Sequence, residues 1–269
     1  IAQFFVVVVR GIDLSVGSMI ALTNVAASFL VSGTPTQVAF GIAAVLLLGV
    51  LLGLVNGLIV VFGRVEPIVA TLATGAIYGG IALLLRPIPG GDIDETLSDL
   101  LTYDIHGVPT SLIVLAIAVI AISIPLRRTR IGLSMLAVGS GEYPAFLTGV
   151  RVDMAKLVAY SVAGLFSALT ALYIAFVTLT GDAGIGPSYT LSSIAAVVLG
   201  GVPLTGGIGA PILAVLGALI LKTISSLMFF SGIPPLAQSF FEGLVLAVAI
   251  AIGAIDALRS RSKLKAFEQ

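Results

Sequence analysis

The stretch Ala44–Val61 reads AVLLLGVLLGLVNGLIVV, and its only polar side chain is the amide of Asn56. It lies in a longer segment, between Asp13 and Arg64, that contains no charged residue. A helix of about 20 apolar residues is long enough to cross the bilayer core. Polar residues do not alternate with the apolar ones, as they would in a strand of a transmembrane β-barrel. The stretch therefore predicts a transmembrane helix.

Charge-free segments of similar length cover most of the chain. Charged residues make up 10% of the sequence and hydrophobic residues 58%, whereas charged residues are about a quarter of a typical soluble domain. So few charges argue against a soluble enzyme, a nucleic-acid binder and a disordered chain. We therefore expect an all-α polytopic membrane protein with one transmembrane domain over 1–269. The chain begins at Ile1 inside an apolar run, so we also expect an N-terminal helix to be missing.

The uncharged segments define eight expected spans and a partial one. The partial span covers 1–10, and turns are expected where Gly and Pro cluster at 32–35 and 231–235. The eight are 16–32, 39–62, 68–86, 109–126, 155–178, a short segment 190–202, 208–230 and 236–257.

Lys and Arg predict the orientation, because they concentrate in short cytoplasmic loops. Alternation of the spans places the loop 131–154 and the C-terminus on the cationic, cytoplasmic side, and the acidic loop 87–108 with Arg86 outside. This alternation of spans is consistent only if residues 190–202 cross the membrane, or re-enter it far enough to return the chain to the cytoplasm. The cytoplasmic cations would be Arg64, Arg127, Arg128, Arg130, Arg151, Lys156, Arg259, Arg261, Lys263 and Lys265.

The motif RGIDLSVG, residues 10–17, places two charges between two spans. Unwound backbone at membrane depth is tolerated inside protein or beside a cavity. One interpretation is a discontinuous helix, broken at Gly11 and Gly17, whose Asp13 and Ser15 line a path. The other is a structural contact between Arg10 and Asp13 near the cytoplasmic interface.

Glycines mark two further kinds of feature. The segment 199–211, LGGVPLTGGIGAP, cannot be a regular helix. We expect the helix to be broken at Gly200, Gly201, Gly206 and Gly207. The segment marks either a permeation region or, over 206–209, a tight cytoplasmic turn. Glycines spaced by four instead predict close helix packing. These are Gly49, Gly53, Gly57, Gly75 and Gly79.

Two charges lie at similar depth in the last two spans. Lys222 and Glu242 flank the turn at 231–235, and we expect them to form an ion pair within the membrane, which lowers the desolvation penalty of both. The alternative is that each faces a water-filled cavity separately.

The sequence offers little for catalysis. It has no cysteine and one histidine, His106, which we expect at the outer membrane interface. No nucleotide-binding signature is present, and the net charge of zero implies no nucleic-acid partner. We therefore expect neither an enzyme nor a resident metal or cofactor, so any ATP would be hydrolysed by another subunit.

The heptad Gly11–Gly17, GIDLSVG, resembles the permeases of ribose-, xylose- and galactose-type ABC importers. Further motifs fit the same family in the same order, so the resemblance extends over essentially the whole chain. They are VNGLI at 55–59, PIVATL at 67–72, Gly139 with Glu142, TGV at 148–150, SIAAVVLGG at 193–201, Gly206–Gly209 and GALI at 217–220.

The resemblance implies about ten spans per subunit in the bacterial inner membrane, with a cytoplasmic C-terminus. It implies a second permease subunit, identical or different, and two cytoplasmic ATPases that carry the ATP and Mg. A periplasmic sugar-binding protein would deliver a monosaccharide or related small polyol for import by alternating access.

The resemblance also places a coupling helix for the ATPase in the loop 131–154. Glu142, Ala145 and Gly149 match the family motif, whereas Tyr143, Pro144 and Phe146 depart from it. Arg151 is a candidate replacement for an arginine that the family has near Phe146. The mixed charge of this long loop fits docking, and the alternative is a plain solvated loop.

Polar residues in the spans are candidates for the translocation path. With Asp13 and Ser15, these are Asn24, Asn56, Thr71, Thr74, Tyr78 and Ser193. Two other functions stay open. One is an ion-coupled secondary transporter in which Asp13, Lys222 or Glu242 carries protons. The other is an ABC permease for branched-chain amino acids or a signalling furanose.

Overall fold

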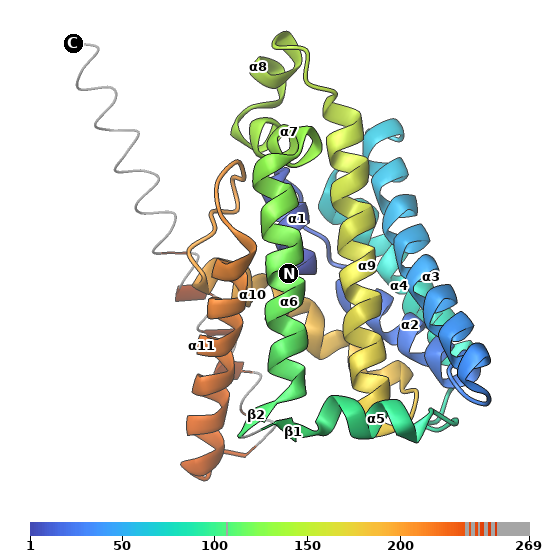
Figure 1. The fold of residues 1–269 in the computed structure, drawn as a ribbon. Coiled ribbons are helices and arrows are strands. Elements are labelled where there is room, and N and C mark those ends of the chain that lie inside the picture. The colour runs from blue at the N-terminus through green and yellow to red at the C-terminus, as the bar shows by residue number, and fades with distance from the viewer. Residues whose placement is uncertain are drawn as a thin grey trace.

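The computed structural model describes residues 1–105 and 107–234, with scattered positions between 237 and 251. Long helices run side by side, and short elements close the two ends of the bundle (Figure 1). The helices are α1 (Ala2–Val8), α2 (Val16–Leu30), α3 (Pro35–Phe62), α4 (Pro67–Leu85), α5 (Glu95–Thr102), α6 (Thr110–Arg128), α7 (Arg130–Ser140), α8 (Glu142–Leu147), α9 (Val152–Thr178), the 3₁₀ helix η1 (Ala183–Ile185), α10 (Gly186–Leu199) and α11 (Pro211–Phe230). Strands β1 (Asp104–Ile105) and β2 (Val108–Pro109) form an antiparallel hairpin.

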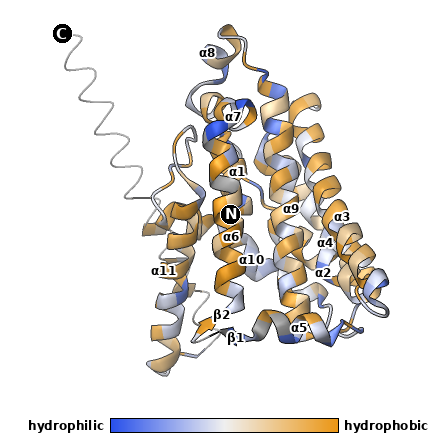
Figure 2. Cartoon of the chain, viewed as in Figure 1, coloured by the Kyte–Doolittle hydropathy of each residue, from blue (hydrophilic) through white to orange (hydrophobic). Residues whose placement is uncertain are grey.

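The two expected loops lie at opposite ends of the bundle and are largely helical. The loop 131–154 holds most of α7 and all of α8, and the loop 87–108 holds α5 and the hairpin (Figure 1). The first end is cationic and the second is acidic in sequence. We call them the α8 end and the α5 end. Between them, the long helices are predominantly hydrophobic (Figure 2).

Four described helices are long and apolar enough to cross a membrane, namely α3, α4, α9 and α11. A fifth results if α6 and α7, which meet at 76°, are counted as one broken span. The expected count of eight spans and a partial one is therefore not confirmed, because α1, α2 and α10 are shorter than a span. Most of the span expected over 236–257 lies outside the described residues.

The sequence explains where α3 begins and how it packs. Thr34 caps its N-terminus, with Gln37 completing a capping box and Pro35 in the first turn. Gly49 and Gly53 lie against α9, where a Cβ on Gly53 would collide with the carbonyl oxygen of Tyr160. The predicted role of these glycines in close packing is confirmed.

The two N-terminal helices form the centre of the molecule. Every residue of α1 is buried, as are most residues of α2, which packs against α3, α4, α9 and α10. Most of the exposed large apolar side chains lie on the surrounding helices and include Phe40, Leu47, Leu72, Leu84 and Ile117. An apolar outer surface around a polar-containing centre fits a bundle surrounded by lipid.

The segment after α9 returns the chain to the α8 end. Gly181 pairs with Gly90 at the α5 end, and Gly207 donates a backbone hydrogen bond to Val8 beside α7. Between these points the chain passes through η1 and α10. The predicted alternation of loops requires such a return over 190–202.

Candidate functional site

The chain is unwound over Val9–Ser15, between the buried helices α1 and α2. Gly11, Asp13 and Ser15 are buried there. The side-chain amide of Gln3, oriented to satisfy both of its ends, pairs with the backbone N–H and carbonyl of Asp13 at 3.1 and 3.0 Å. The predicted unwinding at RGIDLSVG is therefore confirmed for residues 9–15, and the unwound segment lies inside the protein.

A buried hydrogen-bond network surrounds the carboxylate in this unwound segment. Asp13 Oδ1 accepts from the backbone nitrogen and Oγ of Ser15 at 2.8 and 2.6 Å. Asn56 Nδ2 on α3 lies 2.7 Å from Ser15 Oγ and 3.4 Å from Asp13 Oδ2. The hydroxyl of Tyr78 on α4 is 3.2 Å from Asn56 Oδ1. We call Asp13, Ser15, Asn56 and Tyr78 the Asp13 network.

Thr71 extends the contact between α4 and the unwound segment. Its Oγ1 accepts from the backbone nitrogen of Leu14 at 2.9 Å, and Thr74 donates to the carbonyl of Thr71. Buried polar groups require such partners, because an unpaired one is costly. These bonds fix the unwound segment to α3 and α4.

Arg10 bonds to other groups, so the alternative interpretation, a structural contact between Arg10 and Asp13, is not supported. Its Nε lies 2.8 Å from the carbonyl oxygen of Gly139 and 3.0 Å from that of Thr205, and Nη2 lies 3.2 Å from that of Ser140. Gly139 and Ser140 end α7, where unpaired carbonyls favour a cation. Arg10 has a φ of 67°. Its hydrogen-bond partners are distant in sequence, so no pattern of neighbouring residues could indicate them.

The glycine-rich segment forms a tight turn beside Arg10. Gly206 and Gly207 have φ values of 76° and 82°, which glycine adopts readily. A Cβ on Gly139 would collide with the backbone of Val8 and Gly207. Three chain segments thus meet closely at the α8 end, and the interpretation of 206–209 as a turn is favoured.

The other broken-helix glycines occupy different places. Gly200 ends α10 and Gly201 follows it in the turn. Gly17, predicted as a helix-breaking residue, instead lies in the first turn of α2. There a Cβ would collide with the carbonyl oxygen of Gly186. Gly17 therefore permits α2 and α10 to pack closely.

The remaining path candidates are separate from the Asp13 network. Asn24 is buried on α2, accepts from the backbone nitrogen of Asp182 at 2.7 Å, and donates to the carbonyl of Ala171 at 3.1 Å. Ser193 is partly exposed on α10 and donates to the carbonyl of Thr190. That these residues line a translocation path stays a prediction, since all but Ser193 are buried within the subunit.

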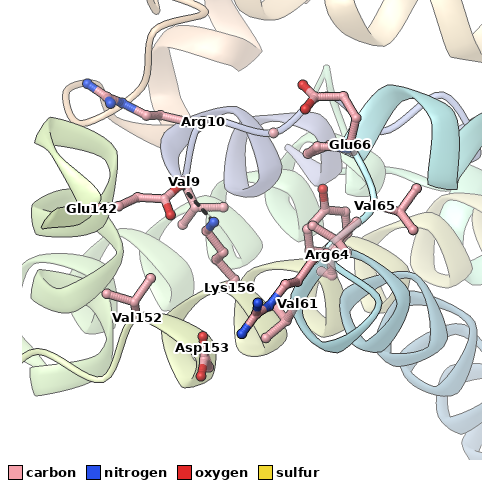
Figure 3. Close-up of a pocket in the computed structure, with 14 residues that line it drawn as sticks. Val9, Arg10, Val61, Arg64, Val65, Glu66, Glu142, Val152, Asp153 and Lys156 are labelled. Carbon is pink, nitrogen blue, oxygen red and sulfur yellow. Dashed lines mark ion pairs between the residues drawn. The ribbon is translucent and has the colours of Figure 1, made fainter. Parts of the chain in front are cut away.

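The predicted coupling residues lie on and beside α8. Ala145 is buried, Gly149 has a φ of 82°, and Arg151 directly precedes α9. Glu142 Oε1 forms an ion pair with Lys156 Nζ of α9 at 2.7 Å (Figure 3). The side chains of Tyr143, Phe146 and Leu147 are exposed, at 66% or more. This end therefore presents an apolar, partly aromatic tip held to α9.

Two predictions involve residues that the structure does not describe, namely the ion pair of Lys222 with Glu242 and the position of His106. Lys222 lies on α11, while Glu242 and His106 are outside the described residues. The membrane-embedded pair stays a prediction. Among the described residues, no group of three or more acidic, histidine or cysteine side chains is arranged to hold a metal ion.

The sequence matches a known protein family over most of its length. Residues 1–250 match the family described as "Branched-chain amino acid transport system / permease component". The chain belongs to this permease family. The match includes the unwound segment, α8 and the glycine-rich turn, and it supports a multi-pass membrane protein.

Curated relatives cover most of the chain. The ribose import permease protein of Haemophilus influenzae is 34% identical over 93% of this chain and 79% of its own. That of Escherichia coli strain K12 is 32% identical over 94% and 80%. The autoinducer 2 import system permease of Escherichia coli O157:H7 is 30% identical over 96% and 80%. No solved structure matches the chain significantly.

Proposed function

We propose that this chain is the transmembrane permease of an ATP-driven importer for a monosaccharide or related small polyol. The observation that carries the proposal is the similarity, over more than nine-tenths of the chain, to permeases named for ribose import. The GIDLSVG motif supports it, since its first five residues belong to the unwound segment between α1 and α2 at the centre of the fold.

The proposed importer contains partners for each step. A second permease subunit completes the pathway, a periplasmic binding protein delivers the sugar, and two cytoplasmic ATPases bind ATP and Mg. The chain lies in the inner membrane with the α8 end and the C-terminus in the cytoplasm. The cations at the α8 end support this orientation.

The contacts at the α8 end suggest how ATP hydrolysis would reach the centre of the permease. The exposed residues Tyr143, Phe146 and Leu147 dock into an ATPase groove. Movement of α8 passes to α9 through the pair of Glu142 with Lys156. It passes to the unwound segment through α7, whose last carbonyls Arg10 holds. The pathway between the two permeases then alternates its access.

Site-specific cross-linking tests the docking. Residues 1–269 contain no cysteine, so Phe146→Cys provides the one thiol within this sequence. We expect it to cross-link to the co-expressed ATPase through a short bifunctional reagent. Tyr103→Cys, which is also exposed but lies at the α5 end, is the matched control and should give no product. Equal cross-linking of the two variants, or none from any position of 140–149, would contradict docking at α8.

A second substrate class is supported by the comparisons themselves. The family description names branched-chain amino acids, and one relative is named for autoinducer 2. Uptake assays with D-ribose, leucine and autoinducer 2, each with its own binding protein, show which of these three substrates the transporter imports. We expect sugar uptake, and uptake of leucine alone would overturn the proposed substrate class.

A further inference from the structure

The polar side chains of α10 and α11 gather in the halves of these helices that lie nearer the α5 end. Five of the six residues 188–193 of α10 carry a hydroxyl group, and four of the five residues 222–226 of α11 are polar. The chain enters α10 from the α5 end, and α11 runs back toward that end (Figure 1). Figure 2 shows hydrophilic colour on both helices within the hydrophobic bundle.

Glycines bring α10 and α11 into close contact in their other halves, nearer the α8 end. A Cβ on Gly200 would collide with the carbonyl oxygen of Leu213, and a Cβ on Gly217 would collide with that of Ala196. These two contacts show that the helices pack antiparallel. Continuing the pairing toward the α5 end, in steps of about four residues per turn, brings the two polar segments level with each other.

The polar halves of the two helices are open, in contrast to the packed halves. None of the residues 187–193 and 222–230 is buried, whereas 194–197 of α10 are all buried. The open halves thus present polar side chains at the surface of this subunit. We call the following residues, which are exposed or partly exposed, the α10–α11 face: Ser188, Ser192, Lys222, Thr223 and Ser226.

The surface of α3 and α4 has a different composition. Beyond the first turn of α3, the exposed residues of both helices are apolar or glycine. Leu47 of α3 and Leu72 of α4 are typical, with 59% and 61% of the side chain exposed. Such a surface suits contact with lipid tails. The α10–α11 face therefore differs from the surface that suits lipid.

Lys222 gives the strongest reason to place water at this face. It is exposed on α11, a helix long and apolar enough to cross a membrane. Lys222 lies eight residues before the end of α11 at Phe230, which is about 12 Å along the helix. A charged side chain at such depth faces the interior of the bundle or a water-filled cavity, because contact with lipid is costly.

The hydroxyl groups of the face can bind a solute as well as water. The side chains of Ser188, Ser192 and Thr223 each donate to a carbonyl of their own helix, at 2.6 to 2.9 Å. A hydroxyl oxygen that donates its proton still accepts hydrogen bonds. The ammonium group of Lys222 adds donors. The face thus offers both kinds of partner to a neutral molecule with hydroxyl groups.

We propose that the α10–α11 face forms one wall of the water-filled translocation path and opens toward the α5 end. The inference rests on the proposed function for the solute and the orientation, and it assigns the path to a surface away from the buried Asp13 network. Ser193, the path candidate that is not buried, lies beside this face on α10. Lys222 then faces water, which is the alternative to an ion pair with Glu242.

Thiol labelling of the complete transporter in proteoliposomes tests the proposal. Residues 1–269 contain no cysteine, so Ser188→Cys and Ser226→Cys each place one thiol on the face. Leu47→Cys and Leu72→Cys are the matched controls on the apolar surface. We expect a membrane-impermeant methanethiosulfonate, applied from outside, to modify the two face positions at least about tenfold faster, because a thiol in lipid stays protonated and the thiolate is the nucleophile. Face positions that react no faster than the controls would overturn the proposal.

Transport by the labelled protein shows whether the accessible surface is the path itself. A bulky methanethiosulfonate on Ser226→Cys should stop most of the ATP-driven uptake of D-ribose, whereas the same treatment of Leu72→Cys should leave uptake unchanged. Full uptake after complete modification of Ser226→Cys would also overturn the proposal.

The two measurements separate this inference from the proposed function. Sugar uptake that requires ATP, in a transporter whose face positions react no faster than the controls, would remove only the proposed path wall. Rapid labelling of the face in a transporter that imports no sugar would remove only the proposed importer.

Discussion

At the scale of single residues, Asn56 is the member of the Asp13 network with the most contacts. Its amide reaches Ser15, Asp13 and Tyr78, and all four side chains are buried. Asn56→Ala would leave these polar groups with fewer partners, so we expect a stability loss of about 1–3 kcal/mol. Thermal unfolding of the purified permease measures it. Ser193→Ala, at a partly exposed site, is the control and should stay within about 0.5 kcal/mol. Equal stability of the two variants would contradict a structural role for the network.

Sequence reasoning at this scale found the residues of the network but not their arrangement. The motif RGIDLSVG and the polar positions in apolar spans identified Asp13, Ser15, Asn56 and Tyr78 as candidates. Their mutual bonds depend on how α3 and α4 pack on the unwound segment, which no local pattern encodes. For the same reason the sequence could not indicate the partners of Arg10, since the carbonyls that it contacts are more than 100 residues away.

At the scale of elements, glycine spacing correctly predicted that α3 packs closely against another helix, and the structure shows that this helix is α9. Gly53→Ala would place a methyl group against the carbonyl of Tyr160, and overpacking of this kind costs about 1–3 kcal/mol. Gly80→Ala on α4 is the matched control, because nothing lies within 4 Å of its Cβ position. Unfolding of both variants in the same detergent gives the comparison. A Gly53→Ala protein as stable as Gly80→Ala would show that the two helices can separate at little cost.

The link between α8 and α9 can be tested in the same way. The pair of Glu142 with Lys156 is partly exposed, at 45% and 19%, so we expect its removal to change stability by less than about 1 kcal/mol. If it transmits movement, Glu142→Gln and Lys156→Met should each reduce ATP-driven uptake. The double variant should lose no more than the worse single one, because the two residues act through one contact. Uptake losses that multiply would show that the residues act independently.

At the scale of the whole molecule, charge placement predicted the two ends, whereas the number of spans expected from hydropathy is not confirmed by the four or five candidate spans of the described residues. The cationic and acidic loops lie at opposite ends of the bundle, as alternation requires (Figure 1). The short helices α1 and α2 are apolar because protein surrounds them, and an apolar segment in a protein core has the same composition as one in lipid. Apolar composition alone therefore does not show which segments form helices long enough to cross the membrane.

The central claim is that this chain forms the pathway of an ATP-driven sugar importer. The most direct measurement is uptake of radiolabelled D-ribose into proteoliposomes that contain the permease and its ATPases. The sugar-binding protein is added outside and ATP is enclosed. We predict accumulation that requires both ATP and the binding protein and stops when ATP is replaced by a non-hydrolysable analogue. Accumulation driven by a proton gradient alone, without ATP, would contradict the claim and favour a secondary transporter.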